Sequence, residues 1–84
     1  MDACIKELYR IGIVPVVALE DAADALPLGD ALKKGGVSAI EVTFRTAAAA
    51  DAIRLLTREM PELLVGAGTV LTKAQADAAI EAGA

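Results

Sequence analysis

Apolar and polar positions along the chain form two kinds of block that alternate from one end to the other. Four blocks carry apolar residues at near-helical spacing, and between them lie three short apolar runs with β-branched residues. The helical blocks are residues 2–11, 21–34, 47–60 and 73–83. The apolar runs are residues 13–19, 37–44 and 63–67. The first run has no polar alternation, which predicts a strand covered on both faces, as in a parallel sheet.

Residues at the block boundaries support these assignments. Gly12 ends the first helical block, and Thr72, followed three residues later by Gln75, fits a capping box that opens the last one. Thr46 is expected to cap the third helix. Pro27 is expected to bend the second helix or to mark a tightened first turn. Pro15 weakens the first strand, because proline cannot donate to a β-ladder.

The order is therefore one helix followed by three β–α units of similar length. The strand ends fall near residues 19, 42 and 67, which is the spacing of right-handed βαβ crossovers on a parallel sheet. A closed (β/α)8 TIM barrel needs on the order of 200 residues or more, and this chain has 84. We therefore expect an α/β fold in which residues 1–84 form a single partial domain, with its open sheet edges covered by further chain or by other subunits.

Composition narrows the possible partners. A net charge of −4 with no basic cluster argues against nucleic acid and against anionic membranes. The apolar runs are too short to cross a bilayer, and the polar N-terminus does not resemble a signal peptide. The single cysteine, Cys4, cannot form an internal disulfide, and without histidine there are few ligands for zinc. We expect a cytoplasmic protein with no metal.

The second strand carries the residues best suited to chemistry. Because side chains alternate along a strand, Glu41, Thr43 and Arg45 share one face. The carboxyl ends of barrel strands are where barrel enzymes keep catalytic groups. Glu41 and Arg45 lie about 13 Å apart along a strand, so a mutual ion pair is not expected. The alternative is that both are simply solvated where the strand ends.

The third strand ends in a small-residue segment that could approach a ligand. Gly66 and Gly68 leave room, and Thr69 offers a hydroxyl beside exposed backbone N–H groups. A dinucleotide site would need a third glycine, which is absent. Packing of this strand under a helix would explain the glycines equally well. The four lysines fall on helical blocks or their starts among acidic neighbours and are expected to be solvated: Lys6, Lys33, Lys34 and Lys73.

Taken together, these segments resemble a known family of enzymes. The segments that carry the resemblance are IVPVV (13–17), GGV (35–37), IEVTFRT (40–46), VGAGTV (65–70) and EAGA (81–84). In order and spacing they resemble the bacterial 2-keto-3-deoxy-6-phosphogluconate / 4-hydroxy-2-oxoglutarate aldolases. The resemblance implies a homotrimeric TIM barrel and class I, Schiff-base chemistry that releases pyruvate and an aldehyde without a cofactor.

The resemblance also implies a role for each matching residue. Glu41 corresponds to the general acid/base that moves protons to and from the carbinolamine and the substrate hydroxyl. Arg45 and Thr69 correspond to residues that hold the keto-acid carboxylate, for which a planar guanidinium is well suited. Gly66 and Gly68 would keep the floor of the pocket open.

Two departures from the family pattern limit what this chain is expected to do. Some members carry an arginine for the substrate phosphate near the end of the first strand, where this chain has ALE (18–20). The Schiff-base lysine of the family lies on a later strand, so the 84-residue chain is expected to be inactive alone. Two other hypotheses stay open: a non-catalytic scaffold that self-associates, and a different phosphate-binding barrel that uses Gly68 and Thr69.

Overall fold

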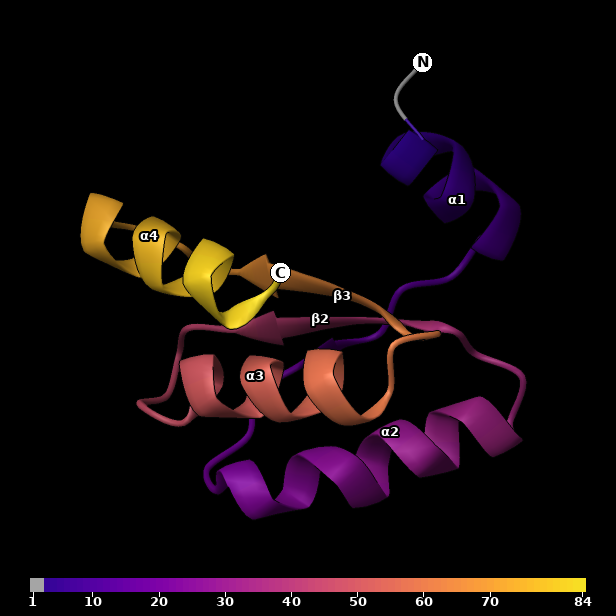
Figure 1. Cartoon of the computed structure of the whole chain (residues 1–84), viewed down its shortest axis with the longest axis horizontal. Helices are drawn as coiled ribbons and strands as arrows, with labels where there is room; N and C mark the ends of the chain where they lie inside the picture. Colours follow the sequence, from indigo (N-terminus) through magenta and orange to yellow (C-terminus); the bar gives the residue numbers. More distant parts are fainter. Residues whose placement is uncertain (1–2) are drawn as a thin grey trace.

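The computed structural model describes residues 3–84, so Asp2, a plausible N-cap of the first helix, lies outside the described part. Helices and strands alternate in the predicted order (Figure 1). The elements are α1 (Ala3–Ile11), β1 (Val16–Val17), the 3₁₀ helix η1 (Ala22–Asp24), α2 (Ala25–Lys34), β2 (Ala39–Thr43), α3 (Ala49–Glu59), β3 (Leu64–Gly68) and α4 (Lys73–Ala82). Across residues 3–84, no helix is long and apolar enough to cross a membrane.

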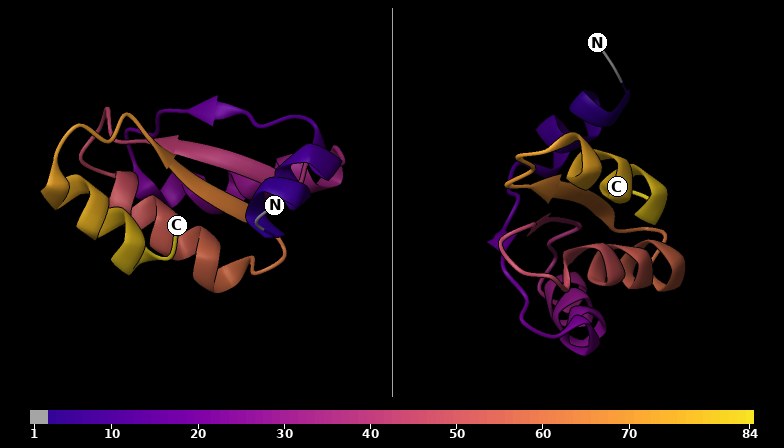
Figure 2. Two further views of the ribbon diagram at one scale, coloured as in Figure 1. Left: turned by 90° about the horizontal axis from the view of Figure 1, so that it is seen from above. Right: turned by 90° about the vertical axis from the view of Figure 1, so that its left-hand side faces the viewer.

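The three strands form one parallel sheet in the order β1-β2-β3. In the left view of Figure 2 the three arrows point the same way, so the carboxyl ends of the strands meet at one edge. The register places Glu41 opposite both Val16 and Gly66, and Thr43 opposite Gly68. The predicted α/β arrangement of a helix and three βα units is confirmed.

One face of the sheet forms the core with α2 and α3, which lie on the same side of it (Figure 1). Ile40 and Val42 of β2 are fully buried, as are Ile53 and Leu56 of α3. The apolar positions of the helical block 47–60, which continue to Met60, therefore form the buried face of this helix. Helix α1 lies on the opposite side of the sheet (Figure 1), so the face that carries Glu41 is only partly covered.

The first strand is much shorter than predicted. Only Val16 and Val17 of residues 13–19 pair as a strand, and Val16 is 57% exposed. The prediction of a strand covered on both faces is wrong here. In the described part of the chain β1 has a single neighbour, β2, and Pro15 contributes only its carbonyl, which accepts from Glu41 N at 2.9 Å. The side chains before it therefore remain largely open.

The predicted cap of the third helix is also wrong. Helix α3 begins at Ala49, and its cap position is Ala48, which makes no side-chain capping bond. The hydroxyl of Thr46 instead donates to the carbonyl oxygen of Leu19, in the segment that follows β1. A partner from another part of the chain has overridden the local capping preference of threonine.

The other two helix starts behave as predicted. The second helix has a tightened beginning, because η1 precedes α2 and Asp21 accepts a hydrogen bond from Ala23 N at 2.9 Å. Pro27 is the third residue of α2, where its missing N–H removes no intrahelical bond. At α4, Thr72 and Gln75 form the predicted capping box.

Candidate active site

The polar residues singled out in the sequence gather at the carboxyl edge of the sheet. Glu41 is half-buried and lies on the face turned away from α2 and α3, since its neighbours Ile40 and Val42 fill the core. Gly66 and Gly68 lie beside it on β3, and Thr69 follows directly. The alternation of side chains along β2 is what sends the carboxylate to this face.

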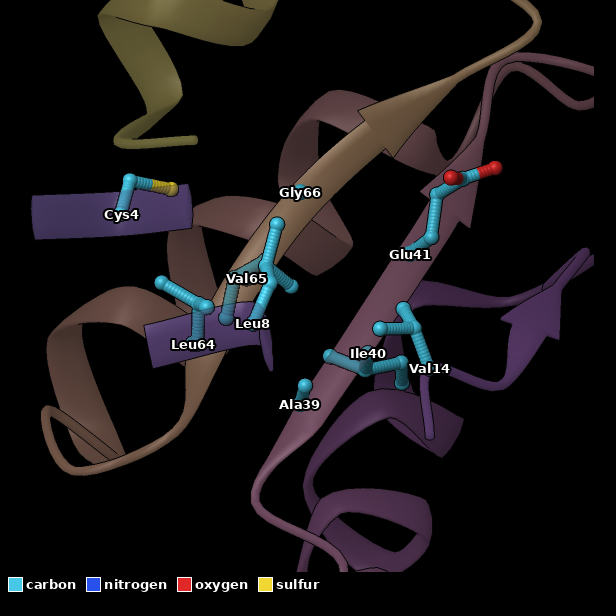
Figure 3. A pocket seen from close by; sticks show the side chains of 9 residues that line it. All are labelled: Cys4, Leu8, Val14, Ala39, Ile40, Glu41, Leu64, Val65 and Gly66. Atoms are coloured by element: carbon cyan, nitrogen blue, oxygen red, sulfur yellow. The ribbon is translucent and has the colours of Figure 1, made fainter. Parts of the chain in front are cut away.

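The carboxylate of Glu41 lies against Gly68. A Cβ atom placed on Gly68 would be 2.1 Å from Glu41 Oε2 and 2.7 Å from Cδ. Gly66 is the register partner of Glu41, yet a Cβ there would meet only Ile40 O, at 4.0 Å. The glutamate therefore leans forward along the sheet, toward its carboxyl edge. Figure 3 shows it pointing away from Val14 and Ile40.

Two threonines tie the end of β2 to the chain that follows β1. Thr43 is only 1% exposed, and its hydroxyl donates to Val17 O at 2.9 Å. Thr46 donates to Leu19 O in the same way. The sequence predicts that Thr43 shares a face of the strand with Glu41, but it does not reveal this contact. The pair fixes the edge next to Glu41 although β1 itself is only two residues long.

Thr69 has an unusual backbone conformation. Its φ is +53°, and it is the only non-glycine residue of the described chain with a positive φ. A β-branched residue rarely adopts this region, and such conformations cost about 1–3 kcal/mol and concentrate at functional sites. No sequence rule would have indicated it. The turn begins immediately after β3, where Phe44 N donates to Gly68 O at 2.8 Å.

Arg45 is brought to the same edge by the backbone. It follows Phe44 just as Thr69 follows Gly68, so the hydrogen bond from Phe44 N to Gly68 O places both residues directly after paired strand ends. Arg45 is exposed and makes no hydrogen bond or ion pair with any residue from 3 to 84. Its guanidinium is available for an anion.

The lysines are exposed, as expected, and most are paired with carboxylates. Lys33 Nζ lies 2.8 Å from Glu62 Oε1, and Lys34 Nζ lies 2.9 Å from Asp30 Oδ2. The hydrogen bond to Glu62 raises the pKa of Lys33, and that to Asp30 raises the pKa of Lys34. A Schiff-base lysine needs the opposite shift, because only the neutral amine attacks a carbonyl.

A cavity of about 200 Å³ lies behind Glu41, between α1 and the starts of β2 and β3 (Figure 3). Its walls are mainly apolar and include Leu8, Val14 and Val65, with Glu41 as a charged wall residue. Residues 3–84 contain no group of three or more His, Cys, Asp or Glu that could hold a metal ion. Glu41 is the charged residue of this apolar space, whereas the guanidinium of Arg45 and the hydroxyl of Thr69 follow the ends of β2 and β3.

Comparison with known proteins gives a consistent result. The family model of KDPG and KHG aldolase matches residues 4–84. The 2-dehydro-3-deoxy-phosphogluconate aldolase of Haemophilus influenzae is 54% identical over 80 residues, covering 95% of this chain and 38% of that protein. That of Treponema pallidum is 49% identical over 84 residues, covering 100% of this chain and 40% of that protein.

Solved structures agree with the sequence comparison. The 2-keto-3-deoxy-6-phosphogluconate aldolase of Zymomonas mobilis ZM4 with 3-phosphoglycerate matches with a TM-score of 0.83 at 45% identity, over 94% of this chain and 38% of that one. The KDPG aldolase of Legionella pneumophila, with pyruvate captured as a covalent carbinolamine, gives a TM-score of 0.80 at 45% identity, over 84% and 34%. The chain thus spans about two fifths of the length of its curated relatives, and it belongs to the KDPG and KHG aldolase family.

Proposed function

We propose that this chain is the N-terminal part of a class I aldolase that cleaves 2-keto-3-deoxy-6-phosphogluconate or 4-hydroxy-2-oxoglutarate into pyruvate and an aldehyde. The observation that carries the proposal is the Glu41 carboxylate, held against Gly68 at the carboxyl edge of a parallel sheet beside Thr69. The covalent carbinolamine of pyruvate in the Legionella relative supports Schiff-base chemistry. We further propose that the whole protein is a cytoplasmic homotrimer and that residues 1–84 form a single partial domain of each subunit.

Glu41 would move the protons of this reaction. When a lysine amine adds to the keto carbon, the resulting carbinolamine hydroxyl must be protonated to leave as water, and a carboxylic acid can supply that proton. In the cleavage step the resulting carboxylate can accept the proton of the C4 hydroxyl as the C3–C4 bond breaks. A half-buried carboxylate at the mouth of an apolar space is suited to both transfers.

Arg45 and Thr69 would hold the carboxylate of the keto acid. The guanidinium of Arg45 is a rigid bidentate donor without a partner within residues 3–84, and such donors match carboxylates closely. Thr69 adds a hydroxyl one residue beyond Gly68, at the same edge. Gly66 would leave space for the three-carbon pyruvyl unit, since a Cβ there would meet only Ile40 O at 4.0 Å, and Gly68 would keep the floor of the pocket open for the Glu41 side chain.

Schiff-base trapping tests the proposed function. The four lysines here are exposed and Lys33 and Lys34 are more basic than usual, so the 84-residue chain should gain no covalent pyruvate when borohydride is added. A chimera in which this chain replaces the matching segment of the Haemophilus influenzae aldolase, 54% identical to it, should gain one adduct per subunit. Intact mass spectrometry measures both.

Two results would contradict the proposal. An adduct on the 84-residue chain would show that one of its own lysines is the nucleophile. A folded chimera that gains no adduct, while the unmodified Haemophilus enzyme does, would show that this segment does not support aldolase chemistry.

A second candidate is a non-catalytic scaffold that self-associates, and the apolar surface supports it. Tyr9 is 87% exposed, Ile13 61%, Leu71 80% and Ile80 72%. Apolar side chains that join into a contiguous exposed patch mark an interaction surface, and self-association would test whether these residues do. We expect light scattering of the 84-residue chain to show oligomers at micromolar concentration. A stable monomer would count against both the scaffold and an uncovered barrel interior.

A further inference from the structure

We propose that Gly68 is a positioning residue whose missing side chain sets the location of the Glu41 carboxylate. The inference rests on the proposed role of Glu41 and goes beyond it, because a glycine is assigned a task that concerns the glutamate and not the substrate. The volume that a side chain on residue 68 would fill is already occupied by Glu41.

The contacts at Gly68 are specific to one side chain. The three atoms nearest to a Cβ on Gly68 are Oε2, Cδ and Cγ of Glu41, at 2.1, 2.7 and 3.1 Å. Real Cβ contacts are longer than the first two, so a methyl group here must displace the glutamate. No backbone atom is among the three nearest, and Gly68 lies within β3 without a positive φ. Alanine therefore fits the strand while displacing the carboxylate.

No hydrogen bond or ion pair within residues 3–84 fixes the end of the Glu41 side chain. Its location therefore depends on where space is available, and a glutamate has three side-chain torsions with which to move. A displacement of about 1 Å at a reacting group can cost on the order of 100-fold in rate.

Gly66 provides a matched structural control. It lies two residues earlier on the same strand and the same face, and it is the register partner of Glu41. A Cβ there would come within 4 Å of Ile40 O alone, at 4.0 Å. Crystal structures of the chimera should therefore show the Glu41 carboxylate displaced in Gly68→Ala and unmoved in Gly66→Ala. An unmoved carboxylate in Gly68→Ala would overturn the inference.

A double-mutant cycle between residues 41 and 68 distinguishes two roles of Gly68: positioning the Glu41 carboxylate, and leaving the pocket open for substrate. In the chimera, Gly68→Ala should lower kcat by about 100-fold with a smaller effect on KM, and thermal unfolding should change little. When Glu41→Gln is already present, Gly68→Ala should lower kcat no more than about 2-fold further, because the group that it displaces no longer transfers protons.

The outcomes are distinguishable. An equal loss in both backgrounds would mean that the methyl group obstructs substrate, and full activity of Gly68→Ala beside an impaired Glu41→Gln would mean that the location of the carboxylate is unimportant; either overturns the inference. Full activity of Glu41→Gln would instead refute the proposed role of Glu41. The two crystal structures would then still decide whether Gly68 sets the location of this side chain.

Discussion

Replacing Glu41 with glutamine should lower the kcat of the chimera by about 10² to 10⁴-fold, the range that general acid–base catalysis contributes. Glutamine has nearly the same shape but cannot exchange a proton at neutral pH. The Glu41 carboxylate has no structural partner within residues 3–84, so the substitution should leave the fold intact. Steady-state turnover of the keto-acid phosphate, measured beside circular dichroism, checks the expectation.

The matched control is Glu81→Gln on the exposed side of α4, which removes the same charge far from the carboxyl edge of the sheet. It should leave kcat unchanged. Turnover within about 3-fold of the parent in Glu41→Gln would show that the proton is moved by another group.

The order of elements was predictable because the signals that define it are local. The helical spacing of Ile53, Leu56 and Met60 indicates a buried face whatever the rest of the fold does. Thr72 and Gln75 satisfy each other within one turn, so their capping box can be read directly from the sequence. The length of β1 could not be predicted from local signals, since pairing there depends on β2 and on the missing N–H of Pro15.

In the candidate site, too, only the features that depend on local sequence signals could be predicted. Alternation along β2 correctly separates Glu41 from the core residues Ile40 and Val42. Sequence could not say that the glutamate leans toward Gly68 and not toward its register partner, because that choice belongs to three side-chain torsions and the space around them. The positive φ of Thr69 runs against the preference of a β-branched residue, so propensity would have argued against it.

Leu56→Ala should cause the largest loss of stability, about 2–5 kcal/mol in the free energy of unfolding. Leu56 is fully buried in α3, and its Cδ2 would lie 2.9 Å from a Cβ on Gly29 of α2. It thus fills the space that a side chain on α2 would otherwise use. An 84-residue domain has only about 4–13 kcal/mol in total, at the usual value per residue. Urea unfolding at one fixed protein concentration measures the loss.

Two further substitutions show whether the lost packing is the cause: a control on the surface and a change in the same contact. Leu71→Ala removes the same atoms from a side chain that is 80% exposed, and it should change stability by less than about 0.5 kcal/mol. Gly29→Ala alone should crowd Leu56 and the Met60 sulfur, which would lie 2.7 Å from the new methyl. Added to Leu56→Ala, the same methyl enters the vacated space and should recover part of the loss. If the double variant is no more stable than Leu56→Ala, then Leu56 does not stabilise the protein through its contact with Gly29 of α2.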